Sequence, residues 1–225
     1  MRTRAQDVEA RARMIERETK IAPPPLCPEI RFHLATEITP IWEATEETLA
    51  RAGLDPPFWA FPWAGGQALS RYLLDHPEAI ASKRMLDFAA GSGICAIAAA
   101  KAGAASVTAA EVDGCAIVAI GLNRALDGVA VETIRADLVG CDVRSFDAVL
   151  AADVCYQRSM AARVVSWLSE IATNGALVLL ADPGRAYAPR KRPRRLACYA
   201  VPTSPELEDL EARETVVWEL LAAPA

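Results

Sequence analysis

The chain has 225 residues, a formal net charge of −5 and a hydrophobic fraction of 52%. That length fits one domain of ordinary size, and the composition is globular rather than disordered. The acidic balance offers no broad basic surface for nucleic acid. The apolar runs are shorter than the roughly 18 residues that a membrane-spanning helix needs. The sequence therefore predicts neither a nucleic acid nor a membrane as partner.

The six cysteines are scattered and form no Cys-x-x-Cys pair, and the chain has two histidines. This pattern predicts no zinc site and indicates reduced thiols in a reducing compartment. The charged first 20 residues lack the apolar segment of a secretory signal, and their acidic residues argue against a transit peptide. We therefore expect a cytoplasmic protein, with the mitochondrial matrix as the location only of a eukaryotic relative. Nothing in the sequence indicates the oligomeric state.

The sequence of the first 55 residues predicts that they form an N-terminal helical extension. Residues 4–20 are charged and helix-favouring, and the proline-rich stretch 22–28 ends that helix. A second helix is predicted over 40–52, with proline in its first turn. The stretch 53–66 is rich in proline, glycine and aromatic residues and predicts a loop, after which helix resumes over 64–75.

From residue 84 onward, short apolar segments alternate with helical ones. Strands are predicted at 84–88, 106–112, 131–137, 146–153 and 176–182. Because these strands are apolar throughout, they indicate a parallel sheet covered by helices on both faces. Two later segments, 197–202 and 215–221, predict antiparallel strands at one edge. We expect an α/β fold with a mostly parallel, Rossmann-like seven-strand sheet, in a domain spanning residues 56–225.

A glycine-rich turn follows the first strand of this sheet. Asp87 lies near the end of that strand, four residues before Gly91, and glycines at 91 and 93 let the backbone approach a ligand where the next helix begins. Glu111 ends the next strand, where a carboxylate can bind both hydroxyls of a ribose. Asp113 is expected to cap the helix that follows. Ligands of open α/β sheets bind at these carboxyl ends, so we expect the site there.

Three interpretations of the glycines compete. The spacing G-x-G-x-x-A, with Glu111 about 20 positions further on, matches the fingerprint of dinucleotide-binding proteins. A three-residue spacer between strand and glycines argues against NAD, and 225 residues hardly accommodate a second catalytic domain. Gly91 and Gly93 are also compatible with a tight turn that binds nothing. The form "LDFAAGSG", with Glu111 and Asp137 at the ends of successive strands, resembles the class I methyltransferases.

That resemblance implies S-adenosylmethionine as the cofactor. Asp87 and the Gly91 loop would hold its methionine part, and Glu111 its ribose. Asp137 and Leu138 would flank its adenine; the alternative for Asp137 is an ordinary polar residue at the end of a strand. The residues expected to bind the cofactor are Trp63, Asp87, Ala89, Gly91, Gly93, Glu111, Asp137, Leu138 and Ala152.

The strand that ends at Asp153 carries the motif that discriminates between substrates. Methyltransferases of planar amide or nucleobase nitrogens often have two prolines after this carboxylate, whereas this chain has "DVCY". Asp-x-x-Tyr resembles the family 16 group of seven-strand protein lysine methyltransferases. Together with "PPFWAFPWAGGQALSRYLLDHPE", "LNRALDGV" and "LADPGRAY", it resembles the electron-transfer flavoprotein beta-subunit lysine methyltransferases. The resemblance runs from about residue 56 to the C-terminus, and the first 30 residues carry no match.

This resemblance implies a protein-lysine N-methyltransferase acting on the electron-transfer flavoprotein beta subunit, with ribosomal stalk protein as a substrate of bacterial members. Asp153 would bind and orient the amine, and Tyr156 would line the lysine channel or anchor the turn. Trp63 would lie over the cofactor, whereas Trp59 and Phe61 belong either there or to the core.

Other interpretations remain open. One is a methyltransferase of a ribosomal protein or small molecule, and another is a non-catalytic module that binds adenosylmethionine or a nucleotide. The basic stretch 188–195 is either a solvated loop or a docking site for an acidic surface of the protein substrate.

Overall fold

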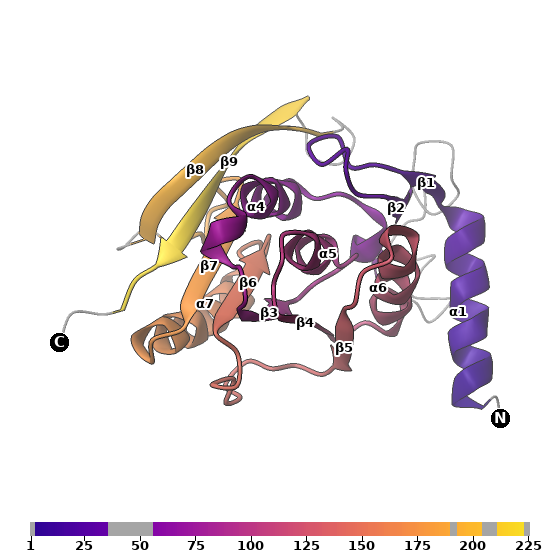
Figure 1. The fold of residues 1–225 in the computed structure, drawn as a ribbon, viewed down its shortest axis with the longest axis horizontal. Helices are drawn as coiled ribbons and strands as arrows, with labels where there is room; N and C mark the ends of the chain where they lie inside the picture. Colours follow the sequence, from indigo (N-terminus) through magenta and orange to yellow (C-terminus); the bar gives the residue numbers. More distant parts are fainter. Residues whose placement is uncertain (1–2, 36–55, 190–192, 204–210, 223–225) are drawn as a thin grey trace.

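The computed structural model describes residues 3–35, 56–189, 193–203 and 211–222. A seven-stranded sheet forms its centre, in the order β5-β4-β3-β6-β7-β9-β8 (Figure 1). The strand bounds are β3 Arg84–Phe88, β4 Ser106–Glu111, β5 Glu132–Arg135, β6 Ala148–Ala152, β7 Leu177–Asp182, β8 Pro193–Pro202 and β9 Ala212–Leu220. Strands β3 to β7 pair in parallel, while β9 and β8 are antiparallel. The expected mostly parallel α/β sheet with an antiparallel edge is confirmed.

Helices cover both faces of this sheet. Their bounds are α4 Ala64–Asp75, α5 Ile94–Lys101, α6 Gly114–Asp127 and α7 Arg158–Thr173, with short 3-10 turns η1 Phe58–Ala60 and η2 Pro77–Ala79. Helices α4 and α5 pack on one face and α7 on the other, with α6 on the same side as α5 (Figure 1). Asp113 caps α6 as expected, because its carboxylate accepts hydrogen bonds from the backbone N–H groups of Cys115 at 2.7 Å and Ala116 at 3.4 Å.

The apolar character of the central strands follows from burial on both faces. Met85 and Leu150 belong to the core under α4 and α5, whereas Leu86 and Val149 belong to the core under α7. Side chains alternate between the two faces of a strand, so both sets must be apolar. The ends of these strands are therefore where polar side chains become informative.

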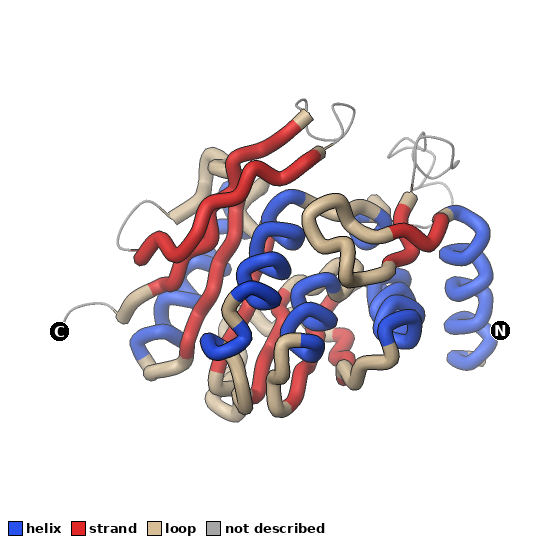
Figure 2. Tube along the Cα trace, turned by 45° about the horizontal axis from the view of Figure 1, so that its top comes forward, coloured by secondary structure: helices blue, strands red, loops and turns tan. Residues whose placement is uncertain are grey.

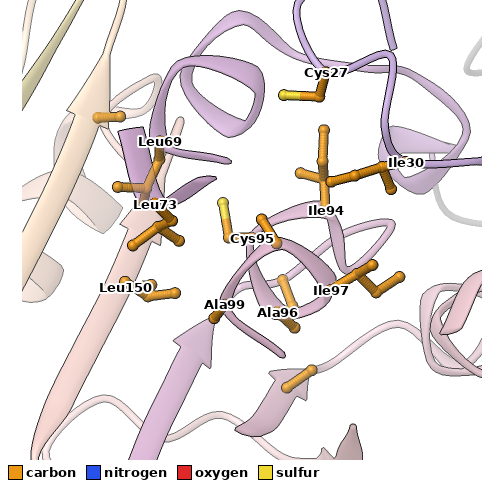
Figure 3. Packing of buried hydrophobic residues seen from close by; sticks show 14 of the residues in the cluster. Cys27, Ile30, Leu69, Leu73, Ile94, Cys95, Ala96, Ile97, Ala99 and Leu150 are labelled. Carbon is orange, nitrogen blue, oxygen red and sulfur yellow. The ribbon is translucent and has the colours of Figure 1, made fainter. Parts of the chain in front are cut away.

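The N-terminal segment contributes to the same core. Helix α1 (Arg4–Glu18) begins with a capping box between Thr3 and Gln6, and its Ile15 is buried in a cluster with residues of η1 and α6. Cys27 and Ile30 pack near α5 in the larger core cluster (Figure 3). The domain boundary at residue 55 stays a prediction.

Two features of the chain differ from the sequence-based expectations. Strands β1 (Lys20–Ala22) and β2 (Phe32–Leu34) form a small antiparallel pair that was not expected. The loop expected over 188–195 was wrong for Pro193–Arg195, because these residues begin strand β8. There Arg194 forms an ion pair with Glu219 of β9, and Figure 2 shows the two strands as a long ribbon far from α1. The helix predicted over 40–52 lies outside the described residues.

None of the described helices has the length and apolar character needed to cross a membrane.

Candidate active site

A pocket of about 500 Å³ opens at the carboxyl ends of β3, β4 and β6. Its volume is that of a small-molecule site, and its place at this edge is where open α/β sheets bind ligands. Its wall combines aromatic and charged side chains. These are Phe58, Trp59, Trp63 and Tyr156, and Glu111, Asp113, Asp153 and Arg185.

A second pocket of about 360 Å³ continues from the first between β4 and β5. Ala89 and Glu111 line both pockets. Asp137 lines the second, where its carboxylate accepts a hydrogen bond from the N–H of Val139 at 3.0 Å and lies 3.6 Å from Arg163. Together the two pockets give an elongated site along the sheet edge.

A larger hollow of about 870 Å³ lies at the opposite end of the strands. Two carboxylates that line it are paired with arginines: Asp147 lies 2.8 Å from Arg84, and Asp142 lies 2.6 Å from Arg144. Because these charges are already balanced locally and exposed to solvent, we place the functional site at the carboxyl edge despite its smaller volume.

Asp87 of β3 supports the glycine-rich turn from inside. It is 2% exposed and lines neither pocket at this edge. Its Oδ2 accepts a hydrogen bond of 2.9 Å from the N–H of Ala96, in the first turn of α5, whose own N-cap Gly93 has no side chain to do so. Burial raises the pKa of Asp87 to about 7, and the nearby Glu111 adds to that rise.

The two glycines of the turn have different surroundings. Both have positive φ, 53° at Gly91 and 82° at Gly93, which favours glycine. A Cβ at Gly91 would have no atom within 4 Å, and Gly91 lines the pocket. A Cβ at Gly93 would lie 3.0 Å from Ile120 of α6. Gly91 therefore leaves open space at the pocket wall, whereas Gly93 allows close packing against α6.

Glu111 connects the turn to the end of β4. Its Oε2 accepts a hydrogen bond from the N–H of Gly91 at 3.0 Å, and its Oε1 accepts from the N–H groups of Val112 at 2.7 Å and Asp113 at 3.3 Å. The carboxylate is thus fixed at the junction of the two pockets. This is the place where a sugar between an apolar base and a charged tail would lie.

Asp153 connects β6 to the start of α4. Its Oδ2 accepts a hydrogen bond of 2.9 Å from the N–H of Gly66, in the first turn of a helix whose N-cap Trp63 gives no side-chain cap. A Cβ at Gly65 would lie 2.6 Å from the same oxygen, so the carboxylate and the helix backbone are in close approach. Its Oδ1 lies 3.6 Å from Nη2 of Arg185. Asp153 therefore caps α4 and lines the pocket at once.

The backbone is strained directly after strands β3 and β6. Among the described residues other than glycine, positive φ occurs at Ser82, at Ala89 with 53° and at Asp153 with 56°. The last two follow the neighbouring strands β3 and β6, and both line the pocket. Such conformations cost roughly 1 kcal/mol or more and concentrate at functional sites.

Aromatic side chains form the outer wall. The ring of Phe58 lies 6.0 Å from that of Trp63 and 5.9 Å from that of Tyr156. The indole Nε1 of Trp63 donates a hydrogen bond of 2.8 Å to the carbonyl of Phe58, which holds this wall together. Burial, with Glu111 as a smaller cause, raises the pKa of Tyr156, so its hydroxyl stays protonated at neutral pH.

The structure brings most of the expected residues to this edge. Trp63, Ala89, Gly91 and Ala152 line the first pocket, with the carboxylates described above. Leu138 packs instead against the core under α7 and lines neither pocket. Trp59 and Phe61 are buried in the cluster with α1 and α6, although Trp59 also reaches the pocket.

Sequence reasoning missed seven of the residues that line the pocket: Pro56, Phe58, Val112, Ala116, Val154, Met160 and Arg185. The motif "LADPGRAY" contributes to the family resemblance, but its sequence does not indicate that its arginine, Arg185, lies beside Asp153. Val112 directly follows Glu111 and is 58% exposed, a position that the end of a strand could have indicated.

Comparison with known proteins identifies the family. The family model described as ribosomal protein L11 methyltransferase (PrmA) matches residues 67–155. The electron transfer flavoprotein beta subunit lysine methyltransferase of Danio rerio is 34% identical over 88% of this chain and 78% of its own length. Its Mus musculus counterpart is 34% identical over 86% of this chain and 77% of its own length. The similarity thus extends further toward the N-terminus than residue 56.

Solved structures share the fold. An RNA methyltransferase of Salinibacter ruber, in complex with S-adenosyl-L-homocysteine, superimposes with a TM-score of 0.51 and 20% identity over 70% of this chain and 94% of its own. The Pyrococcus abyssi tRNA (uracil-54, C5)-methyltransferase does so with the same TM-score and identity over 67% of this chain and 38% of its own. The chain belongs to the electron transfer flavoprotein beta subunit lysine methyltransferase family.

Proposed function

We propose that this protein transfers a methyl group from S-adenosylmethionine to a lysine side chain of a protein. The observation that carries the proposal is Asp153, a strained carboxylate that lines a partly aromatic pocket beside the Gly91 turn and Glu111. Membership in a family of lysine methyltransferases supports the same reaction.

The described residues fit the cofactor. Glu111 lines both pockets. Asp137 lines the second pocket, and Gly91 lines the first, where its lack of a side chain lets a ligand approach the backbone. Glu111 would bind the ribose, the pocket of Asp137 the adenine, and Gly91 and Ala89 the methionine part, with Asp87 supporting their turn from below. Trp63 and Ala152 would border the reacting end. When bound, S-adenosylmethionine supplies an electrophilic methyl group on a sulfonium, which leaves as a neutral thioether.

The protein must bind the side-chain amine of the substrate lysine in its uncharged form. A lysine has a pKa near 10.4, so deprotonating it at pH 7 costs about 4.6 kcal/mol. Phe58 and Tyr156 would cover the alkyl chain and exclude water, which disfavours the ammonium. Asp153 would accept a hydrogen bond from the amine and fix its direction, so positioning carries the rate.

We propose the electron transfer flavoprotein beta subunit as the protein substrate, because the curated relatives are named for it. Ribosomal protein L11 is the second candidate. It is supported by the family model and by an L11 methyltransferase of Trichlorobacter lovleyi, which is 32% identical over 63% of this chain and 49% of its own length. We place the reaction in the cytoplasm, since all six cysteines are free thiols and four of them are buried.

The test is incubation of the enzyme with isotope-labelled S-adenosylmethionine and a cell extract, followed by mass spectrometry of every labelled species. We expect label on lysine of the flavoprotein beta subunit. Label on L11 instead would exchange the substrate but keep the reaction class. Label confined to small metabolites would contradict protein methylation, and S-adenosylhomocysteine binding without any transfer would indicate a non-catalytic binding module.

A further inference from the structure

Arg185 has a fixed place beside the reacting end of the pocket. It follows β7 in the turn that begins at Asp182, where its backbone N–H donates a hydrogen bond of 2.6 Å to the buried carboxylate of Asp182. Its side chain is 27% exposed, and its Nη2 lies 3.6 Å from Oδ1 of Asp153. The backbone and the guanidinium of Arg185 are therefore both held, and its positive charge lies beside Oδ1 of Asp153, while Oδ2 accepts the N–H of Gly66 in α4.

The pocket is otherwise acidic. Among the described residues that line it, Arg185 is the one basic side chain, against Glu111, Asp113 and Asp153. The thiols of Cys95 and Cys155 and the hydroxyl of Tyr156 are neutral at pH 7, because burial raises the pKa of each. The charged and titratable groups around the reacting end are Cys95, Glu111, Asp113, Asp153, Cys155, Tyr156, Asp182 and Arg185.

Asp153 alone would work against methyl transfer. A carboxylate within about 4–6 Å of an amine favours its protonated form by 1–3 pKa units. The ammonium has no lone pair to attack the methyl group. The carboxylate that orients the lysine therefore also stabilises its unreactive form, unless a cation offsets the carboxylate's charge.

We propose, building on the lysine methyltransferase function above, that Arg185 offsets the charge of Asp153 so that the target lysine sheds its proton in the pocket. The proton leaves the ammonium for water before transfer. The amine nitrogen then forms its bond to the methyl carbon while the carbon–sulfur bond breaks, and the positive charge moves from sulfur to nitrogen. Once the proton has left, the reacting pair carries a single positive charge through the transfer, whereas an ammonium beside the sulfonium makes two. Arg185 is thus a positioning residue that acts through Asp153.

The test compares the pH dependence of kcat in Arg185→Gln, Arg185→Lys and Arg144→Gln. Because kcat reports ionisations in the complex with substrate, we expect the acid limb of Arg185→Gln to move up by about one pH unit, with kcat about tenfold lower near pH 7 and recovery at alkaline pH. Arg185→Lys keeps the charge and should restore the wild-type profile. Arg144→Gln removes an equal charge at the far end of the sheet, where Arg144 pairs with Asp142, and should leave the profile in place.

Two readouts separate this effect from loss of structure. Calorimetry with S-adenosylhomocysteine should give wild-type affinity for Arg185→Gln, and titration with the flavoprotein subunit in buffers of different ionisation enthalpy should show fewer protons released. A loss of kcat that is equal at every pH, or a fall in S-adenosylhomocysteine affinity, would overturn the inference and make Arg185 a structural or cofactor-binding residue. Absence of lysine methylation by the wild type at every pH would contradict the proposed function itself, and the inference with it.

Discussion

The ends of the neighbouring strands β3 and β6 each carry an aspartate that caps a helix, but the two aspartates have different surroundings. At the end of β3, Asp87 accepts the N–H of Ala96 in the first turn of α5; after the end of β6, Asp153 accepts the N–H of Gly66 in the first turn of α4. Neither helix has a side-chain cap of its own, so each receives a carboxylate from a strand. Asp87 is sealed in the core, whereas the Asp153 side chain is 14% exposed and faces Arg185.

The comparison shows that capping does not by itself separate a structural carboxylate from a functional one. Each carboxylate accepts a hydrogen bond of 2.9 Å from a backbone N–H group in the first turn of a helix. What differs is the second oxygen: that of Asp153 is directed to a pocket with a cationic neighbour. Replacing the carboxyl group by an amide, which keeps the cap, should therefore act on stability at Asp87 and on catalysis at Asp153.

The largest effect is expected from Asp87→Asn. In the unfolded chain the carboxyl ionises near its ordinary pKa of 3.8, whereas in the fold it stays protonated up to about pH 7. The folded state then binds more protons between these values, so wild-type stability falls as pH rises from about 4 to about 7, by up to about 4 kcal/mol. The amide keeps the acceptor for Ala96 and does not ionise. Urea unfolding across this range should show the wild type losing stability relative to the variant, and parallel curves would show that Asp87 is ionised in the fold.

Asp153→Asn should act on the reaction instead. The amide oxygen still accepts the N–H of Gly66, so α4 keeps its cap and the unfolding temperature should change little. Under the proposed role of Asp153 in orienting the amine, loss of its charge should lower kcat about 100-fold, or about 2.7 kcal/mol. Affinity for S-adenosylhomocysteine, measured by calorimetry, should be nearly unchanged. Full activity in this variant would remove Asp153 from the site.

Alanine substitutions at Gly65 and Gly91 give a third contrast. A Cβ at Gly65 would lie 2.6 Å from Oδ2 of Asp153 and 2.8 Å from the carbonyl of Ala181, so Gly65→Ala must push α4 and β6 apart. We expect about 2 kcal/mol of destabilisation together with lost activity. Gly91→Ala meets no atom within 4 Å and adds only the strain of a positive φ, roughly 1 kcal/mol. Thermal unfolding and cofactor affinity of both variants measure the difference, and equal destabilisation would contradict it.

Glu111→Gln should give a smaller effect than Gly65→Ala. The amide keeps one oxygen for the surrounding N–H groups but loses the charge that we propose binds the ribose hydroxyls. Affinity for S-adenosylhomocysteine should fall about tenfold, or about 1.4 kcal/mol, with little change in stability. Unchanged affinity would assign Glu111 to support of the glycine-rich turn alone.

Sequence reasoning succeeded where the information is local. The apolar runs predicted the sheet, and Asp113 was identified as a cap because its partners are the next residues. The sequence placed Asp87 and Glu111 alike at strand ends, but only packing from α5 distinguishes the buried carboxyl from the one that lines the pockets. The bond from Gly66 to Asp153 spans 87 residues, and the pair of three-residue strands β1 and β2 forms across a loop, so neither leaves a periodic signal.

The most direct measurement is peptide mapping of purified electron transfer flavoprotein beta subunit after incubation with the enzyme and isotope-labelled S-adenosylmethionine, with Asp153→Asn as the control. The account predicts labelled methyl groups on one or more lysines with the wild-type enzyme and almost none with the variant. Label on residues other than lysine, or equal lysine labelling by both enzymes, would contradict it.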